Sequence, residues 1–189
     1  MIENKIPKFI FQTFYASREV SNCPLISEVI RAIKRFEKVD LLIENIEISI
    51  SMKYGMRVLI NAKNIDFNKL NPDDFLEIVD YNPLKKVLLL MGPKEPRIET
   101  PIHWLIHHAR EEVKAIIQID NENFIEHINK KLPITDGKYQ KGSLEQAKEI
   151  LFKLRNSKVV VIKNQGIIFV GESMMDVEDS VIKTFEEIK

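Results

Sequence analysis

Apolar residues recur along the chain with two different periods, which separate the expected helices from the expected strands. Residues 24–39 have the spacing of an amphipathic helix, since apolar side chains fall three or four positions apart at Ile26, Val29, Ile30, Ile33 and Phe36. Residues 46–51 instead alternate Ile with Glu and Ser, which predicts a strand with one buried face. A turn at Tyr54-Gly55 and the apolar residues 57–62 predict its hairpin partner.

The remaining elements follow from the same two patterns and from helix start signals. Further strands are expected at residues 76–81, 85–92 and 113–120 and in a hairpin over 159–171, and helices at 100–112, 121–131, 142–156 and 173–188. Ser143 is the expected N-cap of its helix, with Gln146 in the capping-box position. Strands mixed with helices predict a layered α/β domain. We expect residues 1–189 to form a single domain, in which residues 1–20 add either an extra strand or an N-terminal arm.

Composition narrows the class of protein. The chain has 189 residues, enough for a real core, and its 28 basic and 28 acidic residues are scattered, which argues against a nucleic-acid partner. The single cysteine excludes an intramolecular disulfide and a paired-thiol zinc site. The chain shows neither a signal peptide nor an apolar run of membrane-spanning length, so we expect a cytoplasmic protein without a membrane partner.

Two polar side chains stand out on an otherwise apolar strand. Gln118 and Asp120 are two residues apart and therefore leave the same face of the strand over 113–120. Burying a carboxylate without a partner is costly. Either this end of the strand is exposed to water or the two side chains line a pocket.

The helix expected over residues 100–112 offers a candidate metal site. Glu99, His103 and His107 are four apart in series and share a helix face, as zinc ligands do. The nearby cations Lys94 and Arg97 would oppose a metal ion. We therefore favour ordinary packing for the histidines, and a carboxylate at position 99 is also favoured by the helix dipole alone.

Three stretches, taken in order, resemble the class II aldolase/adducin family, which includes sugar-phosphate aldolases and epimerases. They are "VLINAKNIDFNKLNPDDFLEIVD", "IETPIHWLIHHAREEVKAIIQID" and "VVVIKNQGIIFVGESMMDVEDSV", and the similarity runs from about Pro24 to the C-terminus. The resemblance implies an α/β fold, a three-layer α/β/α class II aldolase-like domain around a mixed, mostly antiparallel sheet. It also implies a homo-oligomer, either a dimer or a tetramer, and a small phosphorylated or carbonyl ligand.

The resemblance places the family's chemistry on particular residues. Glu99 matches the catalytic acid/base, and the helix histidine after it, His103, matches a structural position. The three zinc-binding histidines fall on Gln118, Asp120 and Gln165. Amide oxygens are feeble ligands for zinc, so the expected cofactor of the family lacks its ligands here.

The ligand-binding positions of the family also carry different residues. Its phosphate-cradling loop falls on residues 61–64, its paired serines on Arg97-Ile98, and its glycine-asparagine turn on Glu44-Asn45. The resulting candidate ligand-binding residues are Asn45, Asn61, Lys63, Asn64, Arg97, Gln118, Asp120 and Gln165.

Three functions are compatible with these replacements. The favoured one is a divergent family member that has lost zinc-dependent aldolase activity and serves a binding or assembly role. In the second, an enzyme of lyase or epimerase type uses Asp120, Glu99 and the amide oxygens to hold Mg²⁺ or Ca²⁺. In the third, a metal-free site binds a small ligand through Lys63 and Arg97.

Overall fold

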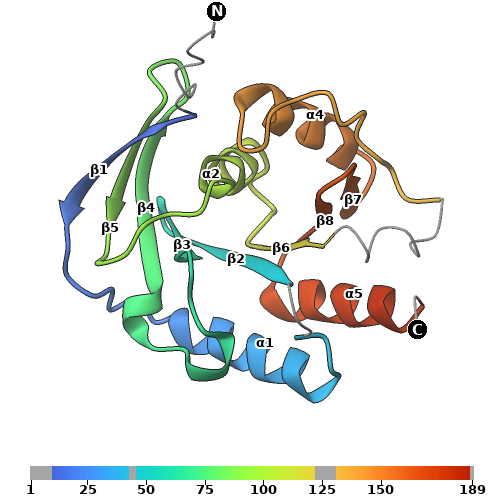
Figure 1. Ribbon diagram of the computed structural model, residues 1–189, viewed down its shortest axis with the longest axis horizontal. Coiled ribbons are helices and arrows are strands. Elements are labelled where there is room, and N and C mark those ends of the chain that lie inside the picture. The colour runs from blue at the N-terminus through green and yellow to red at the C-terminus, as the bar shows by residue number, and fades with distance from the viewer. Residues whose placement is uncertain (1–9, 43–45, 122–130, 188–189) are drawn as a thin grey trace, which may run out of the picture.

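A mixed β-sheet forms the centre of the protein in a computed structural model, which describes residues 10–42, 46–121 and 131–187 (Figure 1). Within these residues the sheet has eight strands in the order β1-β5-β4-β3-β2-β6-β8-β7. Their bounds are β1 Gln12–Ser17, β2 Glu47–Tyr54, β3 Arg57–Asn61, β4 Phe75–Asn82, β5 Val87–Met91, β6 Ala115–Asp120, β7 Val159–Ile162 and β8 Gly166–Gly171. The pair β1 and β5 is parallel, and the other neighbouring pairs of these strands are antiparallel.

Helices cover both faces of the sheet and give the three expected layers (Figure 1). The helices are α1 Ile26–Lys38, α2 Thr100–Ala109, α4 Leu144–Leu154 and α5 Met174–Glu186, with short 3-10 turns at η1 Phe67–Lys69 and η2 Pro72–Asp74. On one face α1 and α5 bury Phe36 and Val177 against Ile50 and Ile117 of the sheet. On the other face α2 and α4 enclose a second apolar cluster with β6, β7 and β8. The predicted layered α/β fold is confirmed.

Two helix ends differ from the predictions. Helix α2 ends at Ala109 because Arg110 adopts an extended backbone, which turns the chain toward β6 three residues earlier than expected. Ser143 caps α4 through its hydroxyl, but Gln146 does not complete a capping box. Instead, the side-chain oxygen of Gln146 accepts a hydrogen bond from the backbone N–H of Gly142, and its amide nitrogen donates one to the side chain of Gln165. The helix predicted over residues 121–131 lies almost wholly outside the described residues.

Strand β2 is buried on both faces, so the prediction of one buried face is wrong. Its Ile48 and Ile50 face α1 and α5 as expected. Ser49 and Ser51 point the other way, and they are buried because α2 lies over them. Alternation of Ile and Ser indicates two different faces, but it does not say whether water or a helix covers the polar one.

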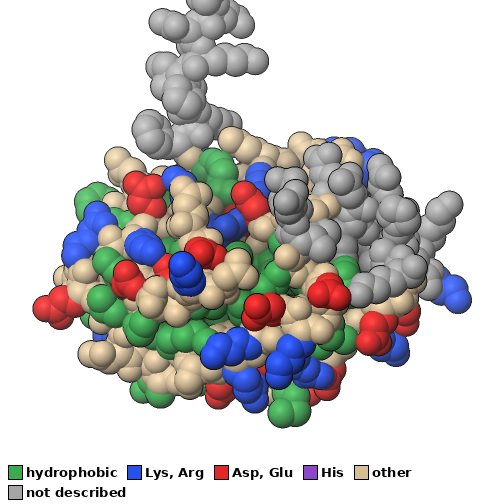
Figure 2. All heavy atoms as spheres, turned by 60° about the horizontal axis from the view of Figure 1, so that its bottom comes forward, with side chains coloured by type: hydrophobic (Ala, Val, Ile, Leu, Met, Phe, Trp, Pro, Cys, Tyr) green, Lys and Arg blue, Asp and Glu red, His purple; other side chains and the backbone are tan. Residues whose placement is uncertain are grey.

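The described part of the N-terminal segment forms a strand. Residues Gln12–Ser17 pair with β5 at the edge of the sheet. Lys, Arg, Asp and Glu side chains are interspersed on the face of the molecule that includes α1 and α5, as the scattered charge of the sequence suggests (Figure 2). Among the described residues, the helices are too short or too polar to cross a membrane.

Candidate functional site

A layer of polar side chains is buried between α2 and the centre of the sheet. Ser49 of β2 pairs in register with Gln118 of β6, and Glu47 pairs with Asp120. Ser49 and Gln118 are each 1% exposed, and Asp120 is 9% exposed. Of the two alternatives for Gln118 and Asp120, exposure of this strand end to water is therefore wrong. Buried polar groups need hydrogen-bond partners, and these come from α2 and from the loops around it.

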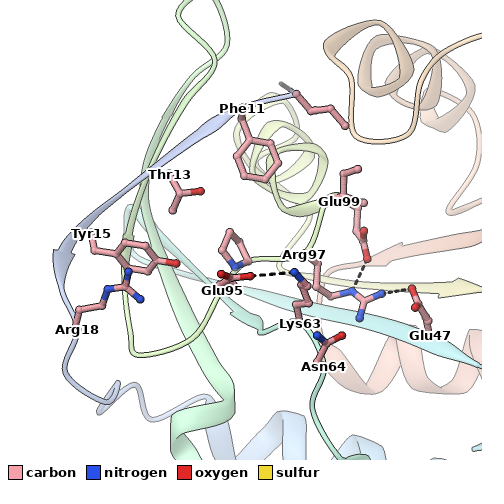
Figure 3. Close-up of a pocket in the computed structure, with 13 residues that line it drawn as sticks. Phe11, Thr13, Tyr15, Arg18, Glu47, Lys63, Asn64, Glu95, Arg97 and Glu99 are labelled. Atoms are coloured by element: carbon pink, nitrogen blue, oxygen red, sulfur yellow. Dashed lines mark hydrogen bonds and ion pairs between the residues drawn. The ribbon is translucent and has the colours of Figure 1, made fainter. Parts of the chain in front are cut away.

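Glu99 immediately precedes α2 and faces this layer. Its Oε1 accepts hydrogen bonds from the hydroxyl of Ser49 and, at 2.5 Å, from Nε of Arg97. Arg97 also donates to Oε2 of Glu47 at 2.7 Å, so one guanidinium holds two carboxylates (Figure 3). Burial favours protonation of Glu99, but the charge of Arg97 and the hydrogen bonds from Ser49 and Arg97 outweigh it and lower the pKa. Glu99 is consequently ionised at neutral pH.

The second carboxylate oxygen of Glu99 has no hydrogen-bond partner among the described residues, although it is buried. The side-chain oxygen of Gln118 and Nε2 of His103 are in the same condition. His103 lies near both residues, since the charge of Glu99 and the side chain of Gln118 both act on its pKa. Of these residues Glu99 borders a cavity, and a buried polar atom without a partner beside a cavity is typical of a place that receives a ligand or water.

The two histidines of α2 share one serine of β2. The hydroxyl of Ser51 lies 2.7 Å from Nδ1 of His103 and 2.9 Å from Nε2 of His107. Nδ1 of His107 lies 3.1 Å from the carbonyl oxygen of Val113 and must carry a proton to donate there. Ser51 therefore donates to His107 and accepts from His103. Burial lowers the pKa of His103 to about 4 and that of His107 to about 3, so both rings are neutral at pH 7.

Gln118, Asp120 and Gln165 meet where β6 and β8 pair. Nε2 of Gln118 donates to Oδ1 of Asp120 at 2.8 Å, and Nε2 of Gln165 lies 3.3 Å from both carboxylate oxygens of Asp120. The next residue, Gly166, pairs with Asp120, and a Cβ atom there would lie 2.0 Å from the carbonyl oxygen of Ile119. Glycine is thus required for the close approach that brings Gln165 over Asp120. Gln146 orients Gln165 by donating to its side-chain oxygen at 2.8 Å.

Lys141 completes this cluster. Its Nζ lies 2.6 Å from Oδ2 of Asp120. Burial opposes the charge of Lys141, but Asp120 and the neighbouring charges of Glu99 and Glu47 outweigh it and raise its pKa. Burial and the charge of Glu99 raise the pKa of Asp120 in spite of Lys141. Lys141 therefore stays protonated at neutral pH, and its positive charge offsets the negative charge of Asp120 and the nearby carboxylates.

A cavity of about 590 Å³ opens beside Glu99 and Arg97 (Figure 3). Phe11, Thr13 and Tyr15 of the N-terminal strand region form one wall, and Glu47 and Glu99 lie at the opposite side. The guanidinium of Arg18 stacks over the ring of Tyr15, 3.3 Å from its centroid. A second cavity, of about 200 Å³, is bordered by Lys141, Gln146 and Gln165. Glu99 and Arg97 thus border the larger cavity, and Lys141 and Gln165 border the smaller one.

Comparison with known proteins identifies the group to which this architecture belongs. Residues 28–123 match the Class II Aldolase and Adducin N-terminal domain. The chain belongs to the class II aldolase and adducin family. It is 26% identical over 144 residues to the L-fuculose phosphate aldolase of Methanocaldococcus jannaschii, an alignment that covers 68% of this chain and 74% of that protein.

Solved structures of class II aldolases share the fold. An L-fuculose 1-phosphate aldolase superposes with a TM-score of 0.70 at 16% identity, covering 88% of this chain and 84% of the other. The L-fuculose-1-phosphate aldolase from Thermus thermophilus superposes with a TM-score of 0.66 at 17% identity, covering 87% and 90% of the two chains.

The residues at the positions that the resemblance assigns to zinc do not fit a zinc ion. Asp120 contributes one carboxylate whose two oxygens already accept hydrogen bonds from two amides and a lysine. The side-chain oxygen of Gln165 is taken by Gln146. In the described part of the chain, His, Cys, Asp and Glu side chains form no group of three or more that could hold a metal ion. His103 and His107 share a face, as their spacing predicts, but both bond to Ser51.

The other predicted class II aldolase positions are divided between the cavity and the core. Lys63, Asn64 and Arg97 line the larger cavity together with Glu99. Asn61 does not: it is 1% exposed and its amide bonds the backbone of Ile48 and Ile50, which ties β3 to β2. Asn61 was predicted to bind a ligand, but in the structure its side-chain atoms bond to β2 and it does not line the cavity. Asn45 lies outside the described residues.

Lys141, Ser49 and Gln146 are site residues that the sequence does not reveal. A carboxylate on an apolar strand demands a partner, and this was the available signal for Lys141. It indicates that a cation is needed but not which one, because Lys141 is 21 residues away from Asp120 in the sequence.

Proposed function

We propose that this protein has kept the cleft of a class II aldolase as a binding site for a small polar ligand and has lost zinc-dependent aldol cleavage. The observation that carries the proposal is that Gln118, Gln165 and Lys141 all donate hydrogen bonds to the carboxylate of Asp120. Zinc-dependent cleavage needs a metal ion as Lewis acid, worth several kcal/mol in the transition state. Two amides and an ammonium group cannot hold that ion.

The cavity favours a ligand that carries hydroxyl or carbonyl groups, and a phosphate group on that ligand would compete with Glu95 for Lys63. Its three cations, Arg18, Lys63 and Arg97, are matched by three carboxylates, Glu47, Glu95 and Glu99. Lys63 is paired with Glu95 at 3.0 Å, and Arg97 is paired twice, so neither is a free anion site. The unpartnered oxygen of Glu99 can accept a hydrogen bond from a ligand hydroxyl.

L-Fuculose 1-phosphate is the first compound to test, because similar proteins are named for it. We expect the purified protein to be stabilised by this sugar phosphate, or by a related hydroxylated compound, in a melting experiment that contains EDTA. We expect no cleavage, with or without added Zn²⁺. Lys63→Ala should weaken the stabilisation, whereas Lys69→Ala, outside the cavity, should not. Zinc-dependent cleavage at enzyme-like turnover would overturn the proposal.

An enzyme of lyase or epimerase type is the second candidate. It is favoured by Glu99, an ionised carboxylate that borders the cavity and has one unpartnered oxygen. Such a group can remove a proton next to a carbonyl. Deuterium exchange into dihydroxyacetone phosphate in D₂O, abolished in Glu99→Gln, would establish this activity. Mg²⁺ or Ca²⁺ bound by Asp120 is disfavoured, because Lys141 contacts the same carboxylate and would repel the ion.

We also propose that the protein forms a homo-oligomer, either a dimer or a tetramer. The support is the family resemblance, since family members commonly assemble with the site at a subunit boundary. Multi-angle light scattering of the purified chain measures the mass directly, and a monomer at micromolar concentration would overturn this part.

A further inference from the structure

The ammonium group of Lys141 contacts the carboxylate of Asp120, on which the side chains of Gln118 and Gln165 converge. It contacts Oδ2 of Asp120 at 2.6 Å, and the amides of Gln118 and Gln165 donate to the same carboxylate. These are the three positions to which the family resemblance assigns the metal ligands. A cation that belongs to the chain therefore occupies the neighbourhood in which a bound cation is expected.

The charges of the cluster show why a cation is needed there. Glu47, Glu99 and Asp120 bring three carboxylates to this end of the sheet, and Arg97 is paired with the first two. Asp120 is paired with Lys141 and is almost fully buried. Without Lys141, Asp120 would be a buried carboxylate next to Glu99 with only amides as partners, which is strongly unfavourable.

The contact differs from the ordinary ion pairs of this protein. Lys138 and Asp136, in the same segment of the chain, are 3.5 Å apart with side chains 73% and 58% exposed. Lys141 and Asp120 are closer and are 34% and 9% exposed. Surface pairs such as the first contribute little, whereas breaking a buried pair leaves an uncompensated charge.

We propose that Lys141 has replaced the metal ion of the class II aldolase site, so that its ammonium group is the built-in cation that neutralises Asp120 and offers N–H donors to a ligand oxygen. Two observations support the donor role: Lys141 borders the smaller cavity, and a third of its side chain is exposed. The inference rests on the proposed function, because it explains how a ligand site of this fold works without a bound metal.

The test is to remove the ammonium group and offer a metal ion in its place. Lys141→Ala leaves Asp120 without its cation and therefore able to attract a divalent metal ion. We expect calorimetry with Mg²⁺, Ca²⁺ or Zn²⁺ alone to show affinity for at least one ion that is roughly tenfold or more above that of the unmodified protein. The same ion should raise the melting temperature of Lys141→Ala and not that of the unmodified protein. Asp120→Asn in the same chain should abolish both effects.

Lys138→Ala is the matched control, since it removes a lysine of the same segment that is paired only at the surface. It should behave as the unmodified protein. Equal metal affinity in Lys141→Ala and Lys138→Ala would overturn the proposal. So would metal binding by the unmodified protein that depends on Asp120.

A double variant tests the proposal even if Lys141→Ala fails to fold. If that variant does not fold, Asp120→Asn combined with Lys141→Ala deletes both charges of the pair and leaves the packing at residue 141 unchanged from the single variant. Recovery of folding in the double variant supports the proposal, because it shows that the unpaired carboxylate was the defect. If the double variant is no better, Lys141 acts through packing and the proposal fails.

These outcomes are separate from those of the proposed function. Cleavage of L-fuculose 1-phosphate by the unmodified protein would overturn the proposed function, whereas metal affinity in Lys141→Ala is measured without substrate.

Discussion

The two faces of β2 and β6 are both buried, yet the chain covers them in opposite ways. Toward α1 and α5 the strands present Ile48, Ile50, Ile117 and Ile119, which join a large apolar cluster. Toward α2 they present Ser49, Ser51, Gln118 and Asp120, which bond to one another and to side chains at the start of α2. The apolar face is typical of any α/β domain. The polar face carries the residues to which the family resemblance assigns chemistry, and here it is filled by hydrogen bonds and ion pairs within the protein.

A drop in pH should damage the polar face most. The pKa values of His103 and His107 fall from 6.5 to about 4 and about 3 on folding. Because the unfolded chain binds protons first, stability is full above pH 6.5 and declines as the pH falls toward 4, by roughly 3 kcal/mol for each histidine. Glu99, whose pKa is lowered, adds to the loss below its ordinary range, and Asp120, whose pKa is raised, opposes it.

Urea unfolding at pH 7, 5.5 and 4 measures this decline. In His107→Gln the loss of unfolding free energy between pH 7 and pH 4 should be about half as large. A stability that is constant over this range would show that the histidines are not buried as neutral rings.

Arg97→Ala should be nearly as harmful, because it leaves Glu99 buried without its cation. We expect a loss of about 3–5 kcal/mol in the free energy of unfolding. The double variant Arg97→Ala with Glu99→Gln should regain much of the loss. If the double variant were as unstable as the single one, packing of the arginine and not charge would be responsible.

Ile117→Ala tests the apolar face at the same strand. Ile117 is fully buried beneath α5, so its truncation should cost about 2–5 kcal/mol through lost contacts and a cavity. In contrast to the effect of acid on the polar face, this loss should be the same at pH 7 and pH 5.5. A strong dependence on pH would mean that the two faces are coupled.

Ser51→Ala should give the smallest of these effects. It removes the hydroxyl that joins His103 and His107 and leaves two buried ring nitrogens without a partner, at a cost of about 1–3 kcal/mol. Ser27→Ala, which loses only an exposed hydrogen bond to the carbonyl of Pro24, is the control and should be close to neutral. Chemical denaturation resolves the difference.

The apolar face could be predicted from the sequence and most of the polar face could not. Periodicity placed Ile48 and Ile50 on one side of β2, because successive side chains along a strand point to opposite faces of the sheet. It could not show that Ser51 meets His103, since the two residues are 52 apart and only the packing of α2 brings them together. The resemblance placed Glu99 beside the site. Lys141 lies in residues 131–142, which form neither a helix nor a strand, so periodicity cannot predict where its side chain points.

Strand β1 carries a further consequence of its place in the sheet. It forms one wall of the larger cavity, and β5 is its one neighbouring strand among the described residues, at the edge of the sheet. A molecule that fills the cavity therefore slows the local opening of this strand. Amide hydrogen exchange at Gln12, whose N–H donates to the carbonyl oxygen of Lys86, then reports occupancy of the cavity without a substrate assay or a label.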